Sequence, residues 1–207
     1  NKGVVNVIYG SGGGLSGNGN QRWRQNDDGL EDKREDNDAF GNDLVAGDFN
    51  GDGFDDLAVG VPGENSGRGA VNVIYGSSGS LTANGNQRWS QQQDDITGGA
   101  ERNNRFGNAV DAADYNGDGY DDLAVGMPFE DGGSVIVIYG SSERLVSAGN
   151  QRWRQGEAGI LDRAESNNRF GGELNSGDFN VDGFADLAIG TAGEDDFQGV
   201  VHIIHGS

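Results

Sequence analysis

Three short motifs recur along the 207-residue chain, and each recurs with the same spacing. The pentapeptide Gly-Asn-Gln-Arg-Trp ends at Trp23, Trp89 and Trp153, and a Phe-Gly pair and an acidic loop follow it each time in the same order. From copy to copy, every motif advances by 66 residues and then by 64. Three markers in register indicate tandem copies of one structural unit, so the fold must be one that is built by repetition.

Each unit is expected to contain four short strands. The Phe-Gly pair opens a short run that leads into the acidic loop, and an Asp-Leu-Ala-Val-Gly run follows the loop. A β-branched run such as Val71 to Gly76 comes next, and the Gln-Arg-Trp segment closes the unit. Turn-forming residues bound each run, and no segment has sustained helical periodicity. Four short antiparallel strands in each tandem unit are typical of propeller blades, so we predict an all-β propeller fold.

The motif positions predict about three blades, with chain ends that are out of phase with them. Residues 1–39 supply the third and fourth strands of a partial blade (Val4 to Tyr9 and Asn20 to Gln25), 40–105 and 106–169 are whole blades, and 170–207 form a blade that lacks its last strand and has its third at Val200 to His205. Closed propellers have about four to eight blades. We therefore expect either a homo-oligomer that completes the ring or part of a larger propeller. The lack of an initiator Met and of a signal peptide favours a processed fragment.

Charge and composition restrict the partners of the chain. The formal net charge is −20, from 34 acidic and 14 basic residues, so no basic stripe can neutralise nucleic acid or an anionic membrane. The chain has no cysteine, which excludes disulfides, zinc–thiolate sites and thiol nucleophiles. No apolar run approaches the length of a membrane span. Cations are the expected partner.

The acidic loops place oxygen-bearing side chains at positions 1, 3, 5 and 9, with a glycine at position 6 that permits a sharp turn. The predicted ligands are Asp48, Asn50, Asp52 and Asp56 in the first loop, Asp114, Asn116, Asp118 and Asp122 in the second, and Asp178, Asn180, Asp182 and Asp186 in the third, with the backbone carbonyls of Phe54, Tyr120 and Phe184 at position 7. Ca²⁺ takes six to eight oxygen ligands in flexible geometry, which suits this set better than the tighter octahedron of Mg²⁺. We therefore predict about three Ca²⁺ ions per chain, with a mainly structural role.

Two features qualify this prediction. An EF-hand loop requires a glutamate at position 12 and flanking helices, whereas position 12 here is Val59, Val125 or Ile189. The EF-hand interpretation therefore fails, and a calcium-binding hairpin loop remains. The third loop also carries Val181 and Ala185 in place of Gly and Asp, although both positions lie outside the ligand set.

The order Phe-Gly, Asp-x-Asn-x-Asp-Gly-x-x-Asp and Asp-Leu-Ala-Val-Gly-x-Pro resembles the FG-GAP repeat of integrin α-subunit propellers and of bacterial extracellular proteins. The last element is Gly60-Val61-Pro62 and Gly126-Met127-Pro128, while the third copy departs as Gly190-Thr191-Ala192. The resemblance covers nearly the whole chain. It implies a propeller with calcium between the first two strands of a blade, and seven blades in the integrin case.

Members of this family mostly bind matrix ligands, other proteins or glycans, so the resemblance implies a non-catalytic adhesion or recognition module at the cell surface or in a secreted protein. Extracellular calcium is millimolar, which suits weak sites. Two alternatives stay open. The chain could be a lectin-like or substrate-docking module of a larger secreted enzyme, or a structural scaffold for oligomer assembly.

Other recurring residues have both structural and functional interpretations. The repeated residues are the three tryptophans, Phe40, Phe106 and Phe170, and the glutamates Glu64, Glu130 and Glu194 after the second strand. The tryptophans are candidate sugar platforms, although packing is the favoured interpretation. The phenylalanines are expected in the core between blades, where the adjacent glycine allows close approach. The glutamates are candidate outer-shell cation ligands, although a solvated loop is favoured. His202 and His205 are absent from the other units, which favours surface substitutions.

Overall fold

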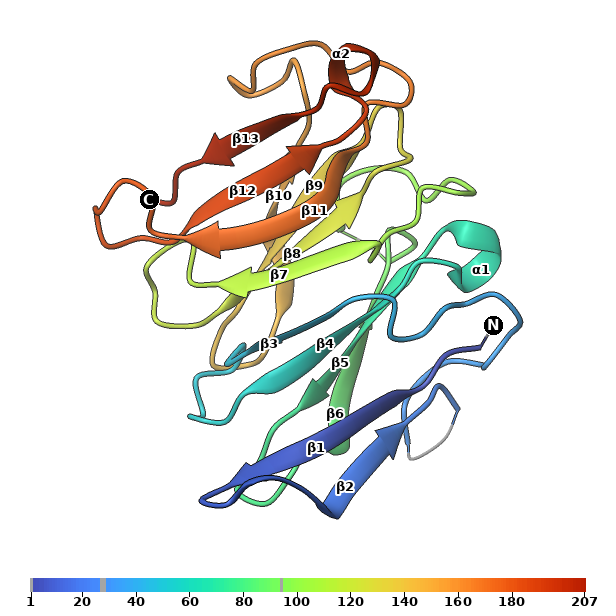
Figure 1. The fold of residues 1–207 in the computed structure, drawn as a ribbon, viewed down its shortest axis with the longest axis vertical. Helices are drawn as coiled ribbons and strands as arrows, with labels where there is room; N and C mark the ends of the chain where they lie inside the picture. The colour runs from blue at the N-terminus through green and yellow to red at the C-terminus, as the bar shows by residue number, and fades with distance from the viewer. Residues whose placement is uncertain (1, 27–28, 94) are drawn as a thin grey trace.

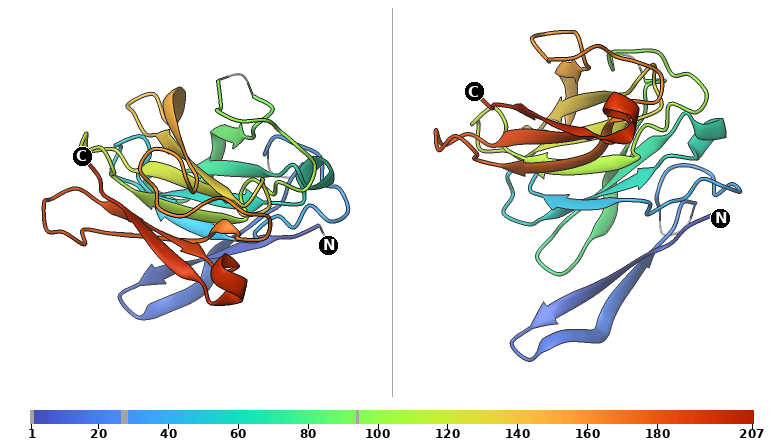
Figure 2. Two further views of the ribbon diagram at one scale, coloured as in Figure 1. Left: turned by 90° about the horizontal axis from the view of Figure 1, so that it is seen from above. Right: turned by 45° about the horizontal axis from the view of Figure 1, so that its top comes forward.

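The computed structural model describes residues 2–26, 29–93 and 95–207, which form an all-β molecule with four antiparallel sheets. The sheets follow one another in chain order along the long axis of the molecule (Figure 1). The N-terminal hairpin lies at one end and the C-terminal sheet at the other (Figure 2).

The two central sheets have four strands each. The strands are β3 (Leu44–Gly47), β4 (Asp56–Val61), β5 (Ala70–Tyr75) and β6 (Thr82–Trp89) in one sheet, and β7 (Ala109–Ala113), β8 (Asp122–Met127), β9 (Ser134–Tyr139) and β10 (Val146–Trp153) in the other. Strands that are consecutive in sequence pair side by side and antiparallel. Each central sheet is therefore the four-stranded antiparallel blade that the repeat predicted.

The outer sheets have fewer strands. They consist of β1 (Val5–Ser11) with β2 (Gly14–Trp23), and of β11 (Phe170–Gly177), β12 (Asp186–Thr191) and β13 (Val200–Ile204). Strand β2 begins earlier than its expected start at Asn20. The β1–β2 pairing shifts register between Val7 and Tyr9 and then continues to the Ser11–Gly14 pair, so residues before Asn20 also join the ladder.

Two single helical turns follow the second strands of their sheets. They are α1 (Glu64–Gly67) and α2 (Glu194–Phe197), and both contain left-handed residues, such as Asn65 at φ 51° and Ser66 at φ 66°. These turns are local chain reversals, which explains why no helical periodicity announces them in the sequence. No helix within the described residues has the length and apolarity needed to cross a membrane.

The core lies between successive sheets. Every residue of β5 is buried, as is every residue of β8, because a neighbouring sheet covers each face of a central blade. Val71 of β5, Phe106 and Ile136 of β9 belong to one apolar cluster that joins the two central sheets. Burial on both faces accounts for the continuous apolar runs in these strands.

The phenylalanine of each Phe-Gly pair joins one blade to the preceding unit. Phe106 is fully buried, and its backbone forms a parallel bridge with Gly69. A Cβ atom on Gly69 would lie 2.2 Å from the carbonyl oxygen of Phe106, so only glycine permits this approach. The same bridge joins Gly3 to Phe40 and Gly133 to Phe170. The prediction that these phenylalanines lie in the core between blades is confirmed.

Candidate metal centres

The three acidic loops connect the first strand of a sheet to the second and emerge on the same side of the molecule, at the left in Figure 1. In the first loop, Asp48 follows the last residue of β3, and Asp56 is the first residue of β4. The antiparallel pairing of Gly47 with Asp56 brings the two ends of the loop together. The loop is therefore the turn of a hairpin whose arms are held by the sheet.

Backbone amides orient the side-chain oxygens of the first loop. The N–H of Asp52 donates to Asp48 Oδ1 at 3.1 Å and to Asn50 Oδ1 at 2.9 Å. The N–H of Gly53 donates to Asp48 Oδ2 at 2.9 Å, and that of Phe54 donates to Asp52 Oδ1 at 3.0 Å. Because one amide binds the oxygens of positions 1 and 3, these two oxygens converge on the inside of the turn. Gly53 has φ +85°, which the turn requires.

The other two loops repeat this arrangement atom for atom. The corresponding four hydrogen bonds span 2.9–3.1 Å in the second loop and in the third. The substitutions at Val181 and Ala185 therefore leave these hydrogen bonds unchanged.

The aspartate at position 9 anchors the loop to the sheet. Asp56 is fully buried, and its carboxylate accepts from the N–H of Phe49 at 3.1 Å and from that of Gly76 at 2.8 Å. Burial raises the pKa of Asp56 to about 6, and repulsion from Asp52 and Asp48 adds to the effect of burial.

The equivalent aspartate of the second loop behaves in the same way. Burial raises the pKa of Asp122 to about 7, with further repulsion from Asp118 and Asp114. In the described part of the chain, no lysine or arginine forms a salt bridge with the proposed aspartate ligands of any loop. Oxygen donors of this type and charge fit a hard cation.

The third loop has a partner that the other two lack. His205 Nδ1 lies 3.2 Å from Asp186 Oδ1 and 3.2 Å from Asn180 Nδ2. Burial acts to raise the pKa of Asp186, but hydrogen bonds from Phe179, Gly206 and His205 together lower it below its ordinary value. His205 is exposed, as expected for a surface position, yet it contacts two of the predicted ligands.

The expectation of a surface position is wrong for the other histidine. His202 is 8% exposed, and its ring lies 5.4 Å from that of Phe170, measured between centroids. Its Nε2 is 3.5 Å from Gln155 Nε2. The side chain is buried because Gln155, at the end of the preceding unit, packs against the face of β13 that carries it.

The aromatic residue at position 7 also links neighbouring loops. A Cβ atom on Gly51 would lie 2.6 Å from Cε1 of Tyr120, and one on Gly117 would lie 2.3 Å from Cε1 of Phe184. The glycine at position 4 therefore makes room for the aromatic ring of the next blade. Sequence reasoning considered position 7 only as a backbone ligand and missed this contact between blades.

The glutamates after the second strands are buried, so the prediction of a solvated loop is wrong. Glu64 is 1% exposed, Glu130 7% and Glu194 9%. Each accepts a hydrogen bond from the glutamine that lies 39 residues earlier, two residues after the repeated tryptophan; Gln25 Nε2, for example, is 2.8 Å from Glu64 Oε2. The partner belongs to another blade, and for that reason local sequence did not reveal it.

The repeated Gly-Asn-Gln-Arg-Trp segment has structural roles. Trp23 and Trp89 are 5% and 7% exposed, as expected for packed rather than sugar-stacking side chains, whereas Trp153 is only half-buried against the apolar cluster of the last two sheets. Gln87 Nε2 donates to the carbonyl of Leu145 in the next unit at 3.0 Å, and the Arg152 guanidinium lies 3.0 Å from the Glu130 carboxylate. The segment therefore ties its strand to neighbouring loops and blades.

Comparison with known proteins agrees with this architecture. The FG-GAP repeat family model matches residues 40–74, 106–138 and 170–204. Integrin alpha pat-2 of Caenorhabditis briggsae is 32% identical over 201 residues, which cover 84% of this chain and 14% of that protein. Integrin alpha-PS2 of Drosophila melanogaster is 34% identical over 180 residues, with 83% and 12% covered.

A protein named for an enzyme activity is also similar. The phosphatidylinositol-glycan-specific phospholipase D of Dictyostelium discoideum is 32% identical over 188 residues, which cover 81% of this chain and 20% of that protein. The chain thus spans a fifth or less of the length of these relatives. Repeats, blade architecture and family match agree, and the chain belongs to the FG-GAP repeat family, with three integrin alpha-like copies in its β-propeller blades.

Proposed function

We propose that this chain is a calcium-binding β-propeller module that acts in adhesion or recognition outside the cell, without catalysis of its own. The observation that carries the proposal is the identical set of hydrogen bonds that orients the side-chain oxygens at positions 1, 3 and 5 of three successive loops. Asp, Asn and Asp at positions 1, 3 and 5, the carbonyl at position 7 and Asp at position 9 would hold one Ca²⁺ in each loop, with water completing the shell.

Calcium would stabilise the folded blades rather than take part in chemistry. Position 9 links its loop to the end of the third strand, as Asp56 does through Gly76, so an ion on this carboxylate would brace three strands of one blade. At a free concentration of 100 times the dissociation constant, one such site stabilises the folded state by about 2.7 kcal/mol.

The recognition role rests on similarity to integrin α chains and on the exposed loops of a rigid repeat scaffold. The ligand would be a protein or a glycan. A docking role within a larger secreted enzyme is the second candidate, because a relative with the same degree of similarity is named as a phospholipase D. A scaffold role in oligomer assembly would require no ligand beyond further copies of the chain.

Native mass spectrometry with Ca²⁺ and after EDTA tests the metal sites. Asp52→Ala removes a proposed ligand, so this variant should hold one Ca²⁺ fewer per chain than the wild type. Asp55→Ala is the matched control, because it removes a neighbouring charge at the position where the third loop has Ala185. The control should hold as many ions as the wild type. Equal counts in wild type and Asp52→Ala would refute the loop site.

Binding to arrays of glycans and of matrix proteins, each with Ca²⁺ and with EDTA, tests the recognition role. Calcium-dependent binding to a defined class of array ligand would support it. Binding to neither array, together with a closed ring of chains by mass, would instead support the scaffold role and contradict recognition.

A further inference from the structure

A glutamate, a glutamine and an asparagine meet at two of the junctions between units. At the second junction, Asn104 Nδ2 donates to Gln91 Oε1 at 3.3 Å and to Glu130 Oε1 at 3.4 Å, and Gln91 Nε2 donates to Glu130 at 3.2 Å. At the third junction, the same bonds join Asn168, Gln155 and Glu194. Two neutral amides thus bind one buried carboxylate at each of these junctions, and at the second junction Arg152 also pairs with Glu130 at 3.0 Å.

The first junction has the same framework with one exchanged group. Asp38 stands where the other junctions have asparagine, and it has no side-chain N–H to donate. Gln25 Nε2 still donates to Glu64 Oε2, at 2.8 Å. Gln25 Oε1, which corresponds to the oxygens that accept from Asn104 and Asn168, is buried and has no hydrogen-bond partner among the described residues. The exchange therefore leaves a buried acceptor beside a second carboxylate.

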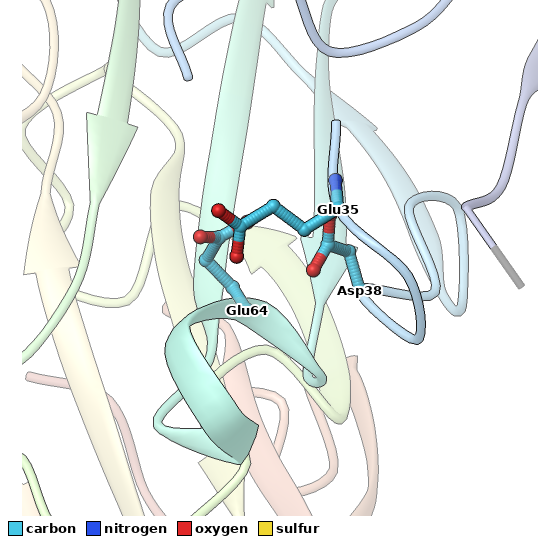
Figure 3. A group of neighbouring side chains, drawn as sticks. All are labelled: Glu35, Asp38 and Glu64. Atoms are coloured by element: carbon cyan, nitrogen blue, oxygen red, sulfur yellow. Dashed lines mark hydrogen bonds between the residues drawn. The ribbon is translucent and has the colours of Figure 1, made fainter. Parts of the chain in front are cut away.

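A third carboxylate completes the group. Ligand oxygens of Glu35, Asp38 and Glu64 all lie within 4.8 Å of one another, and no other such group of three acidic or histidine side chains occurs in the described part of the chain. Figure 3 shows Glu35 and Asp38 reaching toward the carboxylate of Glu64 from the loop that precedes Phe40. Asp38 and Glu64 are each 1% exposed, whereas Glu35 is exposed and lies on the solvent side of the group.

The local charge at this junction differs from that of its counterparts. The segment 35–39 reads Glu-Asp-Asn-Asp-Ala, with a formal charge of −3, whereas 101–105 reads Glu-Arg-Asn-Asn-Arg, with +1, and 165–169 reads Glu-Ser-Asn-Asn-Arg, with 0. Of the arginines, Arg88 approaches Glu64 at 3.9 Å but is already paired closely with Asp32. Arg88 is thus shared between Asp32 and Glu64, and none of the salt bridges among the described residues involves Asp38. Such a lack of positive charge is costly at buried carboxylates unless a cation is present.

We propose that the first junction is a binding site for a hard divalent cation, with Glu35, Asp38, Glu64 and Gln25 Oε1 as ligands. All four donors are oxygens, the type that Ca²⁺ and Mg²⁺ prefer. Glu35 and Asp38 also line a surface hollow of about 610 Å³, from which the ion and its remaining water ligands would enter. The site is separate from the three acidic loops and does not depend on whether they bind calcium.

The burial of the inner carboxyls agrees with this assignment. Asp38 and Glu64 are each 1% exposed, so water solvates neither group well. A bound cation would supply the compensating charge that two buried carboxylates need. Bound metal would in turn couple the loop before Phe40 to the turn α1 of the following unit.

Asp38→Asn is the decisive variant, because it gives the first junction the amide that the other two already have. The variant should fold, and it should hold one divalent ion fewer per chain than the wild type by native mass spectrometry in Ca²⁺ or in Mg²⁺ alone. Glu35→Gln changes an exposed residue and should lose the same ion. Asp36→Asn is the control, because it removes one charge from the same loop at a side chain outside the cluster.

Thermal unfolding gives an independent readout. In EDTA, Asp38→Asn should unfold at a higher temperature than the wild type, because repulsion between buried carboxylates is reduced. When the cation is added, the unfolding temperature of the variant should rise by less than that of the wild type. Equal ion counts for wild type and Asp38→Asn in both metals would overturn the proposal and leave a shared proton in place of the cation. Asp52→Ala tests the acidic loops and Asp38→Asn tests the junction. The ion counts of the two variants therefore distinguish a failure of the junction proposal from a failure of the loop proposal.

Discussion

The side-chain carboxylate of Asp121 accepts a hydrogen bond of 2.8 Å from the backbone N–H of Asp48. The N–H of Asp121 returns to the carbonyl of Asp48 at 3.1 Å. Asp121 is the eighth residue of the second acidic loop and Asp48 the first residue of the first loop, so the pair joins two neighbouring candidate metal loops. In the third loop, Ala185 can offer only its N–H, which reaches the carbonyl of Asp114 at 3.4 Å.

Replacing Asp121 by alanine should weaken the contact between the two blades. We expect the free energy of unfolding to fall by about 1–2 kcal/mol, because a charged acceptor is lost and a partly buried N–H is left unpaired. Urea denaturation with excess Ca²⁺ measures the change. Asp55→Ala is the control, since Asp55 holds the same loop position but is exposed, and should change stability by less than about 0.5 kcal/mol. An equal effect of the two substitutions would contradict the link between loops.

Gly69→Ala should destabilise the protein strongly. Gly69 has φ +86°, and an added Cβ would lie 2.2 Å from the carbonyl oxygen of Phe106, so the bridge between the central blades would have to open. We expect a loss of at least about 2 kcal/mol in the free energy of unfolding, from backbone strain and disrupted packing. Gly79→Ala is the matched control, because a Cβ there meets nothing within 4 Å. Similar unfolding curves for the two variants would show that the close approach does not limit stability.

Val181→Gly should stabilise the third loop. Val181 has φ +62° and is 88% exposed, so a β-branched residue holds a left-handed conformation without packing to offset it. Relief of about 1–2 kcal/mol of strain exceeds the entropic disadvantage of glycine, and the net gain should be about 0.5–1 kcal/mol. Thermal unfolding in excess Ca²⁺ measures it, with an unchanged number of bound ions as the control. A lower unfolding temperature would disprove the strain.

The reverse change at the equivalent glycine should have the opposite sign. A Cβ on Gly117 would lie 2.3 Å from Cε1 of Phe184, so valine there would displace the aromatic ring of the next loop. The same residue type is therefore tolerated at one loop and excluded at another by the neighbouring blade. Local sequence around the two positions does not contain this difference.

The order of the blades and the form of their loops followed from the sequence. Three motifs in constant register imply tandem units, and short apolar runs between turn residues imply four strands in each. The oxygen ligands proposed within a loop, such as Asp48 to Asp56, lie within nine consecutive residues, so their convergence depends on local turn geometry that glycine and aspartate encode directly.

The contacts between blades were decided by tertiary structure alone. Glu64 was expected in solvent but is buried, because Gln25 reaches it from 39 residues away, across a junction. The sequence alone did not show that Asp38, at the position where the other units have asparagine, is special, because an aspartate in an acidic loop is common. Only the fold brings Asp38 and its local neighbour Glu35 beside Glu64, because the two sides of a blade junction come from separate repeats. The sequence by itself thus determined the repeating unit and the acidic loops that are candidate metal sites, whereas the three-dimensional packing of one unit on the next determined which charges are buried together.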